Sequence, residues 1–230
     1  MKPFAWVPTL YFAEAVPYMA VMTLSVILYT RLGLTNTQVA FYTSWLYLPW
    51  VIKPVWSPLV DALRTKRWWI LAMQLLVGAA LAGVAFTLSC PYWLQLSLAF
   101  FWLMAFSSAT HDIAADGFYI LALAPDEPAF YVDFRSTIYR IGMIFCQGVL
   151  VILAGYLERF TSVGAAWQIT LLVTAALMVL LAVWHRWSLS SPEQASAVRA
   201  PLGQSLADTF LTFGRKPGLW ADLLFMLLFR

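Results

Sequence analysis

The chain has 230 residues, of which 62% are apolar and only 11% are charged, and its formal net charge is +3. A soluble domain typically has about 25% charged residues, and a disordered chain combines low hydrophobicity with high charge, so the composition excludes both classes. With a mean hydropathy of +0.77, we expect an integral membrane protein.

Apolar stretches long enough to cross a bilayer follow one another from the N-terminus. A spanning helix needs about 20 mostly apolar residues, and six stretches qualify: 4–29, 37–60, 68–88, 91–124, 136–157 and 165–184. The second is opened by the capping run Thr35-Asn36-Thr37-Gln38. None alternates at every second residue, as barrel strands do. The sequence therefore predicts an all-α integral membrane fold of six transmembrane helices.

The polar stretch after the sixth span divides the chain. We expect residues 1–187 to form a six-helix N-terminal bundle, 188–217 a cytoplasmic linker, and 218–230 the start of a seventh transmembrane helix. As a helix, residues 218–230 extend over only about 20 Å, which is too short to cross the bilayer. The chain is therefore expected to be half of a longer protein.

Basic residues in the loops predict the orientation. If the N-terminus is cytoplasmic, the outer side holds only Arg31 and Arg159. The inner side then holds the other loop cations: Lys2, Arg64, Lys66, Arg67, Arg135, Arg186, Arg199, Arg215 and Lys216. Cytoplasmic loops carry an excess of Lys and Arg, so we expect the N-terminus inside the cell.

Several ionisable residues lie well within the predicted spans: Glu14, Lys53, His111, Asp112, Asp116 and Arg140. A charge at membrane depth costs at least about 2.5–3.5 kcal/mol, so it marks either a functional site or a structural ion pair. Lys53 and Asp116 both lie about 12 Å from the inner surface by helical rise. We therefore predict an ion pair between them, with Glu14 and Asp112 facing a central cavity.

Further polar and aromatic side chains support a cavity. Helical spacing places three groups on common faces: Tyr11, Glu14 and Tyr18; Asp112, Asp116 and Tyr119; and Arg140 with Gln147. Such faces suit a polar ligand such as a sugar or a peptide, although tyrosines also fill the space between helices. Prolines at 17, 49 and 54 interrupt the first two spans, and broken helices tend to line the paths of transporters.

Enzyme and metal chemistry are disfavoured by the residues available. His111, Asp112 and Asp116 suggest an acid/base or metal site, but the only other histidine is His185, at a helix end. No phosphate loop, nucleophile elbow or zinc motif occurs, and the few basic residues do not indicate nucleic-acid binding. We predict no metal, no cofactor and no nucleic-acid partner.

Three motifs carry a family resemblance. The segment Lys53-Pro54-Val55-Trp56-Ser57-Pro58-Leu59-Val60-Asp61, followed by Arg64, Lys66 and Arg67, resembles the end of span two and the signature loop of the major facilitator superfamily. His111-Asp112-Ile113-Ala114-Ala115-Asp116 and Tyr139-Arg140-Ile141-Gly142-Met143 resemble motifs of its muropeptide permease (AmpG-like) branch and the related acetyl-CoA transporters.

The resemblance implies a function for these residues. The superfamily has 12 or more spans, and its loop at Asp61, Arg64, Lys66 and Arg67 latches the cytoplasmic gate. The expected function is proton-coupled import of a small polar solute, such as a cell-wall sugar-peptide, across the inner membrane by alternating access. Glu14 or Asp112 would carry the proton, and the full-length protein would act as a monomer. The alternative is a non-transporting receptor or assembly subunit, in which these charges are structural.

Overall fold

The computed structural model describes residues 3–123 and 127–190, with side chains described for 3–123 and 130–190. The predicted seventh span, almost all of the predicted linker, and Lys2, Arg199, Arg215 and Lys216 lie outside these ranges. All regular elements within them are helical, which confirms the predicted all-α membrane fold. Five segments are continuous, long and apolar enough to cross a membrane: Pro3–Arg31, Lys66–Thr87, Trp93–Ala122, Phe130–Leu157 and Val163–Ser188.

Pro17 determines where the first long segment becomes irregular. It consists of a 3-10 turn (Pro3–Ala5), α1 (Val7–Met19), a π-helical turn (Ala20–Leu24) and α2 (Ser25–Arg31). Pro17 removes one backbone donor from α1, and the irregular turn begins three residues later. The bend therefore has a covalent cause.

The second predicted span is broken into short pieces. These are α3 (Asn36–Thr43), a 3-10 turn (Ser44–Tyr47), α4 (Leu48–Ile52), a second 3-10 turn (Lys53–Val55) and α5 (Ser57–Leu63). A capping box between Thr35 and Gln38 starts α3, as the sequence indicates. Pro49 and Pro54 lie at the starts of α4 and the second turn, where a missing N–H is tolerated.

The remaining spans keep the predicted order with shifted ends. They are α6 (Lys66–Thr87), α7 (Trp93–Ala122) and α10 (Val163–Ser188), with the fifth span formed by α8 (Glu127–Ile144), a π-helical turn (Phe145–Leu150) and α9 (Val151–Leu157). The fifth span begins before the predicted residue 136. The charges of Asp133 and Arg135 suggested a loop, but Phe4 packs edge-on against Tyr131 and Phe134 at the start of α8.

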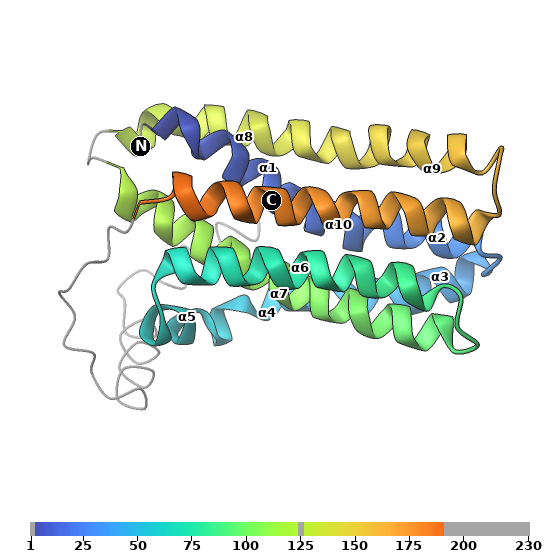
Figure 1. Ribbon diagram of the computed structural model, residues 1–230. Helices are drawn as coiled ribbons and strands as arrows, with labels where there is room; N and C mark the ends of the chain where they lie inside the picture. Colours follow the sequence, from blue (N-terminus) through green and yellow to red (C-terminus); the bar gives the residue numbers. More distant parts are fainter. Residues whose placement is uncertain (1–2, 124–126, 191–230) are drawn as a thin grey trace, which may run out of the picture.

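Close helix packing builds the bundle (Figure 1), in which α6 lies between α7 and α10, and α1 contacts both α8 and α7. Small residues let these helices approach. A Cβ at Gly83 would lie 2.4 Å from the Phe100 ring, and one at Gly142 would lie 2.7 Å from the Ala15 Cβ. The glycine of the Tyr139–Met143 motif therefore sets the distance between α8 and α1.

Candidate functional site

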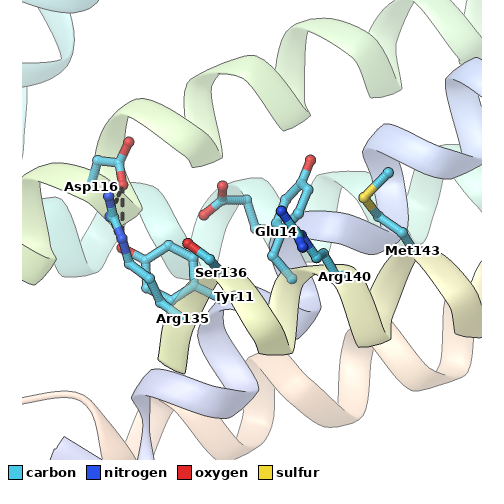
Figure 2. A pocket seen from close by; sticks show the side chains of 8 residues that line it. Tyr11, Glu14, Asp116, Arg135, Ser136, Arg140 and Met143 are labelled. Carbon is cyan, nitrogen blue, oxygen red and sulfur yellow. Dashed lines mark hydrogen bonds and ion pairs between the residues drawn. The ribbon is translucent and has the colours of Figure 1, made fainter. Parts of the chain in front are cut away.

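A cavity of about 420 Å³ opens between α1, α7 and α8 (Figure 2). Most of its lining residues carry a polar group, and two come from α1, one from α7 and five from α8: Tyr11, Glu14, Asp116, Arg135, Ser136, Tyr139, Arg140 and Met143. The volume falls in the range of small-molecule sites, about 300–1,000 Å³. Of the predicted site residues, the structure brings Tyr11, Glu14, Asp116 and Arg140 to this one cavity.

One end of the cavity is held by Arg135 on α8. Its guanidinium forms an ion pair with Asp116 at 2.8 Å and donates to the Tyr11 hydroxyl at 2.7 Å. The Tyr11 hydroxyl in turn donates to Asp116 at 3.2 Å. Arg135 also lies over the rings of Tyr11 and Tyr119, at 5.2 and 4.7 Å from their centroids. These contacts fix the guanidinium by charge, hydrogen bonds and cation–π attraction at once.

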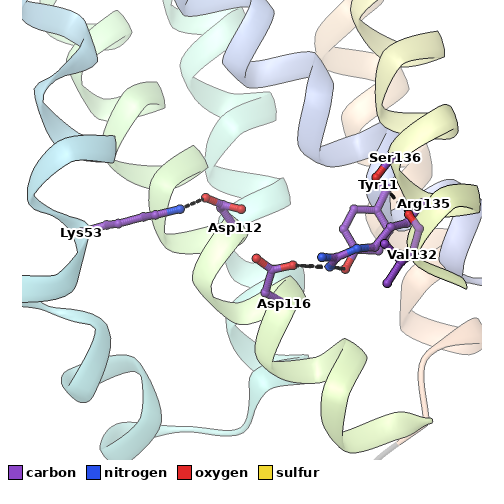
Figure 3. A network of polar contacts seen from close by, with 7 residues as sticks. All are labelled: Tyr11, Lys53, Asp112, Asp116, Val132, Arg135 and Ser136. Atoms are coloured by element: carbon purple, nitrogen blue, oxygen red, sulfur yellow. Dashed lines mark hydrogen bonds and ion pairs between the residues drawn. The ribbon is translucent and has the colours of Figure 1, made fainter. Parts of the chain in front are cut away.

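Lys53 forms an ion pair with Asp112 (Figure 3). The predicted pairing of Lys53 with Asp116 is therefore wrong, since Arg135 is the partner of Asp116. Depth along the helix axis gave Lys53 two candidate carboxylates one turn apart, and a lysine side chain can reach either. The pairing is decided by the direction in which each aspartate points from α7, because Asp116 faces α8 while Asp112 faces the broken second segment.

The Glu14 carboxyl lines the same cavity. Its Oε2 atom is buried and has no hydrogen-bond partner among the described residues. Both nearby aspartates already have a cationic partner, Lys53 for Asp112 and Arg135 for Asp116.

Arg140 lies one helical turn beyond Arg135 on the cavity wall. Its side chain is exposed, and within the described part of the chain it has no ion pair, hydrogen bond or cation–π contact. In the view of Figure 2 the Glu14 carboxyl lies between Arg140 and the Arg135–Asp116 pair. Among the described residues, Arg140 is thus a cavity-lining cation without an ion-pair partner.

Other predicted site residues lie elsewhere. Tyr18 lines a second cavity of about 400 Å³ together with Tyr47, Trp50, Val51 and Lys53. Tyr119 is buried beneath Arg135, and Gln147 bonds to the Met19 sulfur, away from the cavity. These residues share predicted helix faces with Glu14, Asp116 and Arg140, but the bend after Pro17 and the π-turn after Ile144 change the direction in which they point.

Both histidines belong to a buried polar chain that the sequence did not reveal. His111 on α7 and His185 on α10 contact the two ends of the Gln74 amide on α6, each at 3.0 Å. His185 also contacts the Thr9 hydroxyl on α1 at 3.0 Å. His111 and His185 are 1% and 0% exposed. His111 therefore faces away from the cavity, and its neighbour Asp112 points toward Lys53 in the broken second segment.

The predicted gate loop is ordered by its own charges. Asp61 pairs with Lys66, and Arg67 donates to the backbone carbonyl of Arg186 at the end of α10. Arg64 lies over the Trp68 ring, at 5.6 Å from its centroid. The Lys66 side chain crosses α7 at Gly117, where an added Cβ would lie 2.7 Å from the lysine Cε.

The sequence prediction missed half of the cavity wall. Arg135, Ser136, Tyr139 and Met143 line the cavity, yet Arg135 was predicted to lie in a loop. A signal was present, because positions 135, 136, 139, 140 and 143 form one stripe at helical spacing. Starting the fifth span one residue earlier would have placed Arg135 on this stripe.

Comparison with known proteins gives consistent matches. The sequence model described as "BT1 family" matches residues 16–213. The "Anhydromuropeptide permease" of Escherichia coli K12 is 27% identical over 188 residues, which are 79% of this chain and 36% of the relative; the O157:H7 protein gives the same values. An uncharacterized protein of Schizosaccharomyces pombe is 25% identical over 146 residues, 58% of this chain and 27% of that protein. The chain spans about a third of the length of the curated relatives it matches.

Proposed function

Because the chain belongs to the BT1 family, of the major facilitator type, we propose that it is part of a secondary active transporter of the permease class. Its full-length protein would move a small polar solute across the inner membrane by proton-coupled alternating access, with the N-terminus in the cytoplasm and the protein working as a monomer. The solute would be a cell-wall sugar-peptide like the one in the name of the Escherichia coli relative.

The observation that supports this proposal is the cluster of charges at the cavity. Glu14, Asp112 and Asp116 meet Lys53 and Arg135 at membrane depth, beside a space large enough for a solute. A purely structural role would favour closed ion pairs without a cavity. Here the Glu14 carboxyl itself lines the cavity, which is the position required for a proton carrier.

Alternating access needs a contact that differs between two states. The Asp61–Lys66 pair and the Arg67 contact with α10 tie the loop after α5 to the end of the bundle where α10 terminates. We assign these contacts to a latch that stabilises one state and opens in the other. During this change the helices would bend at the broken second segment and at the π-helical turns.

Transport by the full-length protein tests the proposal directly. In proteoliposomes with an imposed inward proton gradient, a radiolabelled anhydromuropeptide should accumulate above its external concentration, and an uncoupler should abolish this accumulation. Binding without accumulation would instead identify a receptor, and chemical conversion without accumulation an enzyme.

The proton carrier is tested in the same assay. Glu14→Gln should remove the dependence of accumulation on the proton gradient, because glutamine keeps the shape of the side chain but cannot release a proton. Asp112→Asn should weaken it by freeing Lys53 from its partner. If both variants retain full pH-dependent accumulation, the assignment of the proton to these carboxyls is wrong.

A further inference from the structure

The second cavity, of about 400 Å³, differs from the first in being lined mainly by aromatic rings. Its lining residues come from α1 and the broken second segment: Tyr18, Tyr47, Trp50, Val51 and Lys53. Tyr18 lies one helical turn after Glu14 on α1, about 6 Å along the axis. This aromatic cavity is therefore a close neighbour of the charged cavity that Glu14 lines.

The three rings of the aromatic cavity lie in two nearly perpendicular orientations. The Trp50 and Tyr47 rings are close to parallel, with 21° between their planes and 6.3 Å between their centroids. The Tyr18 ring stands at 90° to Trp50, with the centroids 5.2 Å apart. Positions 47 and 50 are three residues apart, so both rings leave the same side of their segment. The cavity thus offers flat ring surface from one segment and a second ring at a right angle to it.

Two of these rings carry polar groups that are available to a ligand. Within the described part of the chain, the Tyr47 hydroxyl and the Trp50 indole N–H have no hydrogen-bond partner. Neither belongs to the polar atoms that are buried without a partner, so both can be reached from outside the protein. Buried tyrosine and tryptophan normally bond through these groups. Here the bonds can be made to an occupant of the cavity.

The ion pair at the edge of the cavity limits which occupants fit. Lys53 lines the cavity, and its ammonium is paired with Asp112 (Figure 3). Charges at membrane depth face the bundle interior or a water-filled space rather than lipid, which argues against an acyl chain. An organic cation, which aromatic rings also attract, would meet the Lys53 ammonium. An anion would meet a lysine that Asp112 already neutralises. A neutral polar ring fits best.

We infer that the aromatic cavity binds a sugar ring of the transported solute, with a C–H face of the pyranose stacked on Trp50. This inference rests on the proposed transport function and names the group that is recognised beside the charged cavity. A pyranose has faces of C–H groups, which suit the negative face of an aromatic ring. The hydroxyls around its rim both donate and accept, and so match the Tyr47 hydroxyl and the Trp50 N–H.

Binding to the purified full-length protein tests this inference. The probes are an anhydromuropeptide and its peptide portion without sugars, and calorimetry measures the affinity for each. Trp50→Leu should lower the affinity for the anhydromuropeptide about 3- to 10-fold, the range of aromatic ring contacts, and should not change the affinity for the peptide. Leucine keeps an apolar side chain but has no ring face. Trp50→Phe keeps a ring and should bind the anhydromuropeptide more tightly than Trp50→Leu does.

A second tryptophan on the same segment provides the matched control. Trp45 is 61% exposed and lines neither cavity. Trp45→Leu should therefore leave the affinity for both probes unchanged. The thermal midpoint of each variant, measured without ligand, shows that the comparison is made between folded proteins.

Equal affinity of Trp50→Leu and the unaltered protein for the anhydromuropeptide would overturn the inference, and uptake measured by accumulation would still stand. If the unaltered protein does not bind the anhydromuropeptide, the proposed substrate is wrong, and N-acetylglucosamine, a neutral pyranose, decides the inference. In saturation-transfer NMR its ring C–H protons should receive magnetisation from the unaltered protein and less from Trp50→Leu. Equal transfer or none would refute a sugar site. Binding of tetramethylammonium that depends on Trp50 would identify a cation site instead.

Discussion

Helix α7 has two polar faces that differ in the kind of group they hold. On one face, His111 contacts Gln74 and, through it, His185 and Thr9, in a chain of hydrogen-bonding groups with both histidines buried. On the other face, Asp112 and Asp116 form ion pairs beside open cavities. Two consecutive residues, His111 and Asp112, belong to different faces because successive residues in a helix point about 100° apart.

The difference shows how a membrane bundle divides polar groups between stability and function. Polar groups that hydrogen-bond with one another can be buried between helices, and here they connect four helices. Charges remain costly even when paired, and here they lie where a solute and protons can reach them. Variants on the open face should therefore change transport as well as stability, whereas variants on the sealed face should change stability alone.

Breaking the Lys53–Asp112 pair should have the largest effect. Lys53→Met leaves a carboxylate uncompensated at membrane depth, which we expect to cost about 3–5 kcal/mol of folding stability and to abolish transport. The double variant Lys53→Met/Asp112→Asn should recover most of the stability but not the transport. Thermal unfolding of the full-length protein together with the uptake assay measures both.

Charge reversal distinguishes the observed partner from the predicted one. Lys53→Asp/Asp112→Lys should fold better than either single reversal, whereas Lys53→Asp/Asp116→Lys should not, since Asp116 is paired with Arg135. Rescue by the second exchange alone would contradict the pairing in the structure.

Gln74→Leu should have the next largest effect, and on stability alone. It leaves the ring nitrogens of His111 and His185 without their shared partner, which we expect to cost about 2 kcal/mol or more. The affinity of the folded fraction for its solute should not change, because Gln74 does not line the cavity. Gln168→Leu, which removes a contact with Ser89 at the exposed end of α10, is the control and should change stability little. A changed affinity with normal stability would place Gln74 in the functional site.

The two faces also show what the sequence can and cannot predict. Helix length, composition and the Thr35 cap gave the order of the helices, because these depend on local chemistry. Glu14, Asp116 and Arg140 were singled out as charges within apolar stretches, and the structure places all three in the lining of one cavity. Direction around the helix was not available, so Lys53 received the wrong partner and His111 was assigned to the cavity. Arg135 was missed because its charge lowered the hydropathy of a turn that aromatic packing makes helical.

Gly142 tests how closely the open face depends on helix spacing. In Gly142→Ala the added Cβ would lie 2.7 Å from the Ala15 Cβ and 3.3 Å from the Phe12 carbonyl oxygen, so α8 must move away from α1. We expect a loss of about 1–3 kcal/mol, as for other overpacked sites, and weaker solute binding because both helices line the cavity. Gly155→Ala, with no atom within 4 Å of its added Cβ, should be neutral or slightly stabilising. Equal effects in the two variants would argue against the close contact.

The smallest effect is expected from a third polar cluster, at the opposite end of the bundle from the gate loop. There Glu158 pairs with Arg31 and accepts a hydrogen bond from the Trp167 indole at 3.1 Å. The hydrogen bond from Arg31 lowers the pKa of the Glu158 carboxyl below its ordinary value of 4.5. Exposed ion pairs contribute little to stability. We therefore expect this cluster to stabilise the fold less than the ion pairs at the cavity do.

The sign of the pH effect follows from that lowered pKa. The folded protein holds the ionised carboxylate more strongly than the unfolded chain does, so the pair contributes fully above about pH 4.5 and loses its contribution as the pH falls through the lowered value. The thermal midpoint of the unaltered protein should therefore exceed that of Arg31→Gln by a small margin at neutral pH, and the two should converge in acid. Because Arg31 is half exposed, added salt should shrink the margin as well. A margin that grows on acidification would mean that Glu158 is stabilised in its protonated form, which would contradict a solvated ion pair at this end of the bundle.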